Sequence, residues 1–257
     1  ELVRSHELLS PSLVCFLFEH KLRAQIQSHR FASRTCFLLN ARGHVASSGK
    51  KSNMASIAEA AASVEAACAQ FLSAASPEQR TQAEQFLLGF RKHPQPLPVC
   101  QHLLLNSTVS YAKLQALYTV RECLGALWPG LAAEERTELQ RLLLQLQTAG
   151  AATERYVSEA AAQVLAVHAK HDLLHADGGA TSSAADVLLH GATQMLEEPS
   201  GAHAEAALRV LSAMLTEFGA PSAGTVGGGL AWSSHARARS AFEERYLAPL
   251  CALGMRY

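Results

Sequence analysis

Three histidines, His168, His171 and His175, have the residue type and spacing that could hold a metal ion. Positions i, i+3 and i+7 share one helix face, and Asp172 lies beside them, so zinc is the ion that such ligands would take. The helical pattern ends near His171 and Asp172, however, and the helix dipole alone favours histidine at a C-terminus. The sequence therefore favours a solvated helix end over a metal site.

Other clusters lack the neighbours that their chemistry requires. The glycines at 227–229 are followed by no Lys-Ser/Thr and preceded by no strand, as a phosphate-binding loop would need. Glu134 and Glu135 are adjacent in sequence, so on a helix they point in different directions and cannot form a facing acid–base pair. No Ser-His-Asp or Cys-His set is local, although one formed at long range would not be visible. We expect no enzyme activity and no cofactor, with a compact helical-bundle enzyme kept as an alternative.

Composition argues against a nucleic-acid or membrane partner. The chain has 22 Lys/Arg and 22 Asp/Glu; residues 1–53 hold eight basic and three acidic ones, which leaves 14 and 19 downstream. Arg237, Arg239 and Arg245 form too short a basic stripe for nucleic acid. No apolar run reaches about 18 residues, the length of a membrane span. Six widely spaced cysteines without C-x-x-C favour buried thiols in a reducing compartment.

Residues 1–53 show short apolar runs without sustained period, whereas Met54-Ala55-Ser56 resembles a natural start with a helical pattern directly downstream. We interpret 1–53 as translated upstream sequence or a gene-model extension, and we expect it to be disordered. A transit peptide is the alternative, because the segment is rich in Arg and Ser and poor in acids.

The stretch from 76 to 128 has the clearest helix boundaries. Ser76 and Pro77 have the types expected at a helix start, and Gln79 completes a capping box. Arg91 and Lys92 suit the last turn, and the prolines that follow prevent continuation. The apolar positions of this first helix recur at i, i+3, i+4 and i+7, which predicts one buried face. They are Ala83, Phe86, Leu87 and Phe90.

The same pattern continues to the end of the chain, with no convincing strand. Predicted helices recur as pairs about every 40 residues, the period of HEAT-type repeats, which stack because each pair buries its face only against its neighbours. We therefore predict an all-α fold over 54–257, a right-handed α-solenoid of about three and a half to four HEAT-type repeats. The second helix of each pair should line the inner surface, and we assign that place to 97–106, 131–147 and 182–197. A glycine-rich loop is predicted at 219–234, with Pro249 in the first turn of a final helix.

A run of motifs resembles the N-terminal region of the importin-beta superfamily of nuclear transport receptors. The segment at about 76–128 carries it, within a likeness that covers roughly 57–253 and includes Leu215-Thr216-Glu217-Phe218. Its structural positions are Ala83, Glu84, Phe86, Leu87, Phe90, Val99, Leu103 and Trp128.

The resemblance implies a nuclear export receptor that shuttles between nucleus and cytoplasm. It implies as partners GTP-bound Ran, nuclear pore proteins and protein cargo, namely hypusinated translation factor 5A, Smad3 and Sox-type factors. The alternative is a HEAT or armadillo scaffold without a transport role.

Candidate partner-binding residues lie on the predicted inner helices, away from the apolar stripes. The acidic pair stands at the mouth of the second inner helix, where it suits a basic partner surface. The candidates are Gln101, Glu134, Glu135, Gln140, Arg141 and Gln194.

Overall fold

The computed structural model describes residues 50–93, 96–149, 153–175, 183–198, 200–219 and 231–256, with side chains from Ser56 onward. The first helix already begins at Lys50, four residues before the expected start at Met54. The interpretation of residues 1–49 as an upstream extension or transit peptide lies outside the described residues.

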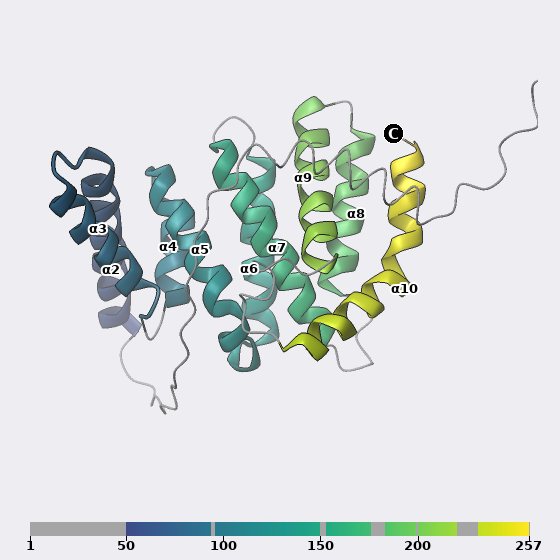
Figure 1. Ribbon diagram of the computed structural model, residues 1–257, viewed down its shortest axis with the longest axis horizontal. Helices are drawn as coiled ribbons and strands as arrows, with labels where there is room; N and C mark the ends of the chain where they lie inside the picture. Colours follow the sequence, from purple (N-terminus) through teal and green to yellow (C-terminus); the bar gives the residue numbers. More distant parts are fainter. Residues whose placement is uncertain are drawn as a thin grey trace, which may run out of the picture. The chain divides into compact units, whose positions relative to one another are not determined.

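Within these ranges the chain is all-helical, as predicted, with nine α-helices, one 3₁₀ turn and no strand (Figure 1). The elements are α2 (Lys50–Ser73), α3 (Pro77–Phe90), α4 (Pro96–Asn106), α5 (Ser110–Leu127), η1 (Trp128–Gly130), α6 (Ala133–Thr148), α7 (Arg155–His175), α8 (Ala184–Glu197), α9 (Gly201–Phe218) and α10 (Trp232–Arg256). None of the helices in the described ranges is both long and apolar enough to cross a membrane.

Contacts divide the chain into two units. The larger, 43–239, holds α2 to α9 and the beginning of α10. The smaller comprises 1–42 and 240–257, of which the structure describes the remainder of α10. In that part the rings of Phe242 and Tyr246, one turn apart, have centroids 5.5 Å from each other.

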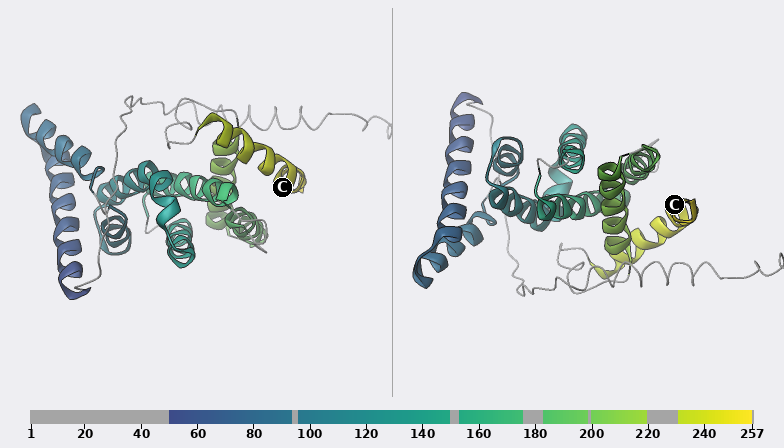
Figure 2. Two further views of the ribbon diagram at one scale, coloured as in Figure 1. Left: turned by 90° about the horizontal axis from the view of Figure 1, so that it is seen from below. Right: turned by 90° about the horizontal axis from the view of Figure 1, so that it is seen from above.

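Helices of the larger unit pack in consecutive pairs: α2 with α3, α4 with α5, α6 with α7 and α8 with α9. The second helices of the last three pairs, α5, α7 and α9, contact one another in series. Both views in Figure 2 show α4, α6 and α8 on one side of that row. This arrangement is compatible with a helical-repeat stack.

The assignment of 97–106, 131–147 and 182–197 as second helices is wrong. These segments are α4, α6 and α8, and each is the first helix of its pair. The connection decides the pairing of α4, because only 107–109 separate it from α5 and a short link makes sequential helices neighbours. The Ser107 hydroxyl accepts the Val109 N–H at 3.0 Å and tightens that turn. Apolar periodicity shows which face a helix buries, but it does not show which neighbour covers that face.

Helix α3 begins as predicted. The Ser76 hydroxyl accepts the Gln79 N–H at 3.3 Å, and Gln79 Oε1 accepts the Ala75 N–H at 3.2 Å. Ala83, Leu87 and Phe90 are buried. Phe86 is 46% exposed, so its place on the buried face was predicted wrongly. Helix α3 packs chiefly on α2, and one neighbour covers only a narrow stripe.

Helix α7 is the centre of the larger unit, in contact with α5, α6, α8 and α9. It runs to His175, past the end predicted near His171 and Asp172, because no proline or glycine interrupts it there. Four neighbours enclose it almost entirely, so its buried residues include three with ionisable side chains, His168, Lys170 and His171.

Helix α10 begins earlier than expected. It starts at Trp232, inside the segment predicted as a loop, and Pro249 lies within the helix rather than in its first turn. The remainder of the predicted loop, 220–230, lies outside the described residues.

Candidate functional site

The predicted partner-binding residues lie on α4, α6 and α8 and differ in how exposed they are. Glu134, Glu135 and Arg141 are exposed on α6, and Gln194 is exposed on α8. Gln101 on α4 is half-buried. The structure thus places most of them on the layer formed by the first helices of the pairs.

Gln140 is the exception, and its prediction as a contact residue is wrong. Its side chain is buried, and its Nε2 donates to the Ala184 carbonyl at 3.1 Å. That bond joins α6 to the first turn of α8 and gives the buried Gln140 amide a hydrogen-bond partner. Gln140 therefore holds two repeats together instead of facing a partner.

Carboxylates on α6 have separate roles. Glu135 Oε2 accepts the Ala132 N–H at 2.9 Å and caps the helix start. Arg141 reaches Glu138 with two bonds, at 2.9 and 2.6 Å, and hydrogen bonding to this guanidinium lowers the pKa of the Glu138 carboxyl. Glu134 is exposed at the helix N-terminus, where the helix dipole favours negative charge.

The motif residues hold helices together more than they face solvent. Exposed among them are only Glu84 and Phe86. The buried ones are Ala83, Leu87, Phe90, Val99, Leu103 and Trp128.

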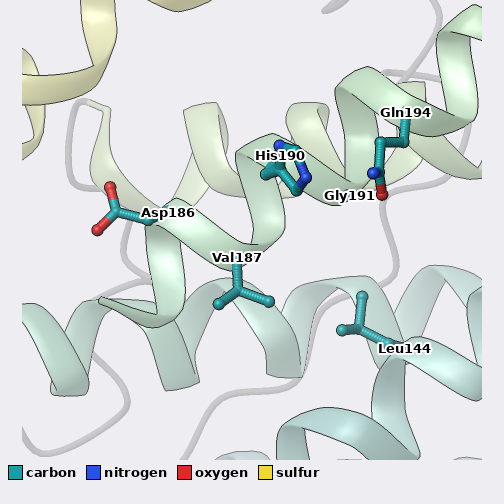
Figure 3. A pocket seen from close by; sticks show the side chains of 6 residues that line it. All are labelled: Leu144, Asp186, Val187, His190, Gly191 and Gln194. Carbon is teal, nitrogen blue, oxygen red and sulfur yellow. The ribbon is translucent and has the colours of Figure 1, made fainter. Parts of the chain in front are cut away.

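A hollow of about 350 Å³ opens between α6 and α8 (Figure 3). Figure 3 shows Leu144 of α6 and Val187 of α8 directed into the gap between the two helices, with the amide end of Gln194 also on the side of α6. Val187 is 44% exposed. The other residues that line the hollow are Asp186 and Gly191. The arrangement is an open apolar depression edged by polar side chains, a form suited to a side chain of another protein.

A second hollow, of about 290 Å³, lies between α2 and α3 and includes the exposed ring of Phe86. Beside it the Arg80 guanidinium lies 5.6 Å from the centre of the Phe71 ring, a cation–π distance. Leu72 and Leu88 are also exposed on these two helices.

The three histidines surround Trp128. The Trp128 ring centre lies 4.9, 5.5 and 6.3 Å from those of His168, His171 and His175. On α6, Arg136 donates to the Trp128 carbonyl at 3.0 Å and lies 4.7 Å from the ring centre. The cluster is therefore an aromatic and cationic contact between η1, α6 and α7.

Burial sets the charge state of the two inner histidines. His168 is 2% and His171 is 1% exposed, and this burial lowers the pKa of each to about 4. His168 Nε2 lies 3.0 Å from the Arg136 carbonyl, whereas neither ring nitrogen of His171 has a hydrogen-bond partner. The prediction of a solvated helix end is wrong for both, and only His175 is exposed.

The metal alternative receives no support from the described part of the chain. No set of three or more His, Cys, Asp or Glu side chains there is arranged to hold a metal ion. Asp172, the acid nearest in sequence, binds the start of α8 instead, because its Oδ2 accepts the Ala184 N–H at 2.7 Å.

A buried ion pair joins the C-terminal part of α7 to the last turn of α9. Lys170 Nζ donates to Glu217 Oε1 at 2.8 Å and to the Glu217 carbonyl at 3.1 Å, with the two side chains 0% and 7% exposed. Each charge alone would carry a large desolvation penalty in the interior, and the ion pair offsets this penalty. Sequence reasoning missed this pair, since the partners are 47 positions apart and leave no local signal.

No protein-family model matches the chain. Sequence reasoning also missed Leu144, Val187 and His190, which line the α6–α8 hollow with the predicted Gln194. Val187 did carry a signal: it lies on α8 beside the buried Leu188, and so falls outside the main apolar face of that helix.

Proposed function

We propose that this chain is a protein-binding helical-repeat region. The observation that carries the proposal is the row of second helices, α5, α7 and α9, each of which exposes a large apolar side chain. Tyr118, Tyr156 and Leu208 are 37%, 43% and 51% exposed. Exposed tyrosines and aliphatic side chains on successive elements of a stack suit contact with another protein.

The more specific proposal is a nuclear transport receptor of the importin-beta superfamily that binds GTP-bound Ran. The resemblance at 76–128 supports it, as does the burial of six of its eight motif residues where α3, α4 and η1 meet their neighbours. The order of Glu78-Gln79-Arg80, Val99-Cys100 and Leu215-Thr216-Glu217-Phe218 favours exportin-4 within that superfamily. On this proposal the protein shuttles through the nuclear pore with hypusinated translation factor 5A, Smad3 or Sox-type factors as cargo.

The observed pairing of helices changes which helices we expect to contact Ran. Second helices of the repeats carry it on this proposal, so α5, α7 and α9 replace the first-helix residues as the leading candidates. Glu134 and Glu135 then act at longer range, where negative charge attracts a basic partner and raises the association rate.

Binding of the 257-residue chain to purified Ran, loaded with a GTP analogue or with GDP, tests the proposal. We expect clear preference for the GTP form, with a dissociation constant of tens of micromolar or weaker, because a short stack offers few buried anchors. Tyr118→Ala with Tyr156→Ala should raise the dissociation rate. Glu134→Lys with Glu135→Lys should mainly slow association.

Equal affinity for the two nucleotide states would remove the transport function and leave the scaffold. A HEAT or armadillo scaffold without a transport role is the second candidate, supported by the same exposed row. Its sign is a partner that binds through Tyr118 and Tyr156 and is indifferent to Ran.

A further inference from the structure

We infer that the hollow between α6 and α8 is a docking site for a basic linear segment of a partner protein, with one aliphatic side chain inserted between Leu144 and Val187. This goes beyond the proposed function, because it concerns a short peptide segment on the first-helix layer and not a folded GTPase on the second helices.

The shape of the hollow sets the size of the anchor. Leu144 and Val187 approach each other from two helices, and Gly191 leaves the α8 backbone uncovered beside them (Figure 3). A Cβ added at Gly191 would meet nothing within 4 Å, so no side chain of the described residues occupies the space directly beside it. A depression of about 350 Å³ accepts a leucine-sized side chain with room for the flanking backbone.

The charge of the two helices selects the flanking residues. Five carboxylates lie on α6 and α8, against two guanidinium groups. The carboxylates are Glu134, Glu135, Glu138, Asp186 and Glu197, and the cations are Arg136 and Arg141. Arg136 donates to the Trp128 carbonyl, and the charges of Arg141 and Glu138 offset each other in their ion pair, so the two helices together keep an excess of negative charge.

Distance keeps this negative charge effective at the hollow. Asp186 lines it, while Glu197 lies three residues, roughly 4.5 Å, from the lining residue Gln194 along the α8 axis at the usual helical rise. That separation is shorter than the Debye length of about 8 Å at physiological salt, so part of the field reaches the anchor site. Lysine or arginine on both sides of the aliphatic anchor therefore complements the surface, and an acidic segment is repelled.

The site can be blocked without cutting into the fold. Gly191→Leu places a side chain in the hollow and replaces a glycine in a helix interior by a strong helix former. Gly89→Leu is the matched control, because Gly89 lies in α3, away from the hollow, and its added Cβ also meets nothing within 4 Å. Both variants should fold, and only the first should lose the site.

The experiment is a fluorescence-anisotropy titration of the full chain with a labelled twelve-residue peptide, one leucine flanked on each side by lysine and arginine. We expect a dissociation constant of about 10–100 μM at low salt, weakened about tenfold by Gly191→Leu and unchanged by Gly89→Leu. A peptide with serine for leucine, and one with glutamate for lysine and arginine, should both bind at least tenfold more weakly, as expected for a lost anchor and for reversed charge.

Three outcomes would overturn the inference: no binding of the basic peptide, equal binding to the Gly191→Leu variant, or equal binding of the acidic peptide. Concentration-dependent self-association of the chain that Gly191→Leu abolishes would overturn it too, because the occupant would then be a second copy. The titration contains no Ran, so its failure leaves the proposed function untouched, and a failed Ran experiment leaves this site untouched.

Discussion

Helices α3 and α7 of the larger unit differ in what their sequences show and in what the fold makes of them. Helix α3 has a complete set of boundary signals and a regular apolar stripe, yet three of its 14 residues are buried. Helix α7 has weak boundary signals and carries five polar residues from His168 to His175, yet 13 of its 21 residues are buried.

The difference comes from the number of neighbours. Helix α3 packs chiefly on α2, whereas α7 packs on α5, α6, α8 and α9. A helix with neighbours on several sides buries some of its polar residues as well, and these need partners inside the protein. Lys170 pairs with Glu217, and the His168 ring lies within hydrogen-bond distance of the Arg136 carbonyl. The stability of α7 therefore depends on polar contacts in addition to many apolar ones, and that of α3 on a few apolar ones.

The largest effect is expected at the α7–α9 ion pair. Lys170→Met should lower the free energy of unfolding by about 3–5 kcal/mol, because Glu217 would remain buried and charged without its partner. Lys170→Met combined with Glu217→Leu should recover most of this loss, since an apolar pair of similar volume carries no desolvation cost. Urea unfolding, followed by circular dichroism, measures the free energy of unfolding of the unchanged protein, the single variant and the double variant.

The exposed pair at the other end of α7 is the control. Arg155 Nε lies 2.9 Å from Glu159 Oε1, with both side chains largely in solvent. Arg155→Ala should leave the urea midpoint unchanged, because exposed pairs contribute little. A double variant at Lys170 and Glu217 as unstable as the single one would show that α7 needs the volume or shape of these side chains rather than their pairing.

Two phenylalanines of α3 sharpen the comparison from the other side. Phe90→Ala should cost about 3 kcal/mol, as for a buried aromatic side chain, whereas Phe86→Ala should cost less than about 1 kcal/mol. Phe90 is 8% and Phe86 46% exposed, although the sequence places both on one stripe. Thermal unfolding of the two variants measures the difference. Similar losses would mean that α3 is covered on a wider face than its packing on α2 indicates.

Periodicity and capping signals predicted helix existence well and helix surroundings poorly. The Ser76 cap and the buried Ala83, Leu87 and Phe90 follow from local rules, because i, i+3, i+4 spacing and a capping side chain act within one helix. The pairing of helices, the burial of His171 and the role of Gln140 depend on contacts between segments distant in sequence.

The candidate site divides in the same way. Gln194 was predicted from its place off the apolar stripe of α8, and it lies at the hollow. Leu144 could not be predicted, and the place of Val187 off the apolar face of α8 indicates exposure without showing that α6 lies opposite. In sequence, a buried apolar position and an exposed one look alike when the neighbouring helix is not known.

The smallest effect concerns pH, and it again separates α7 from α3, which has no histidine. His168 and His171 have pKa values lowered from 6.5 to about 4 by burial. Above pH 6.5 both are neutral in the folded and the unfolded chain. Between pH 6.5 and 4 the unfolded chain takes up protons that the folded chain excludes, so stability falls as pH falls.

At pH 5 each histidine should cost about 2 kcal/mol relative to pH 8, and the loss should level off below pH 4. The groups that face them act in both directions: Arg136 and His175 oppose protonation, and Asp172 favours it. His171→Phe should remove about half of the loss without destabilising the protein at pH 8, because neither nitrogen of His171 has a partner and an aromatic ring still stacks on Trp128. Urea unfolding at pH 8, 6.5 and 5 measures this, with the exposed His190→Gln as control. If the His171→Phe variant kept the full pH dependence, the loss would arise from groups other than His171, and the burial of this ring in neutral form would not explain why the stability of α7 falls with pH.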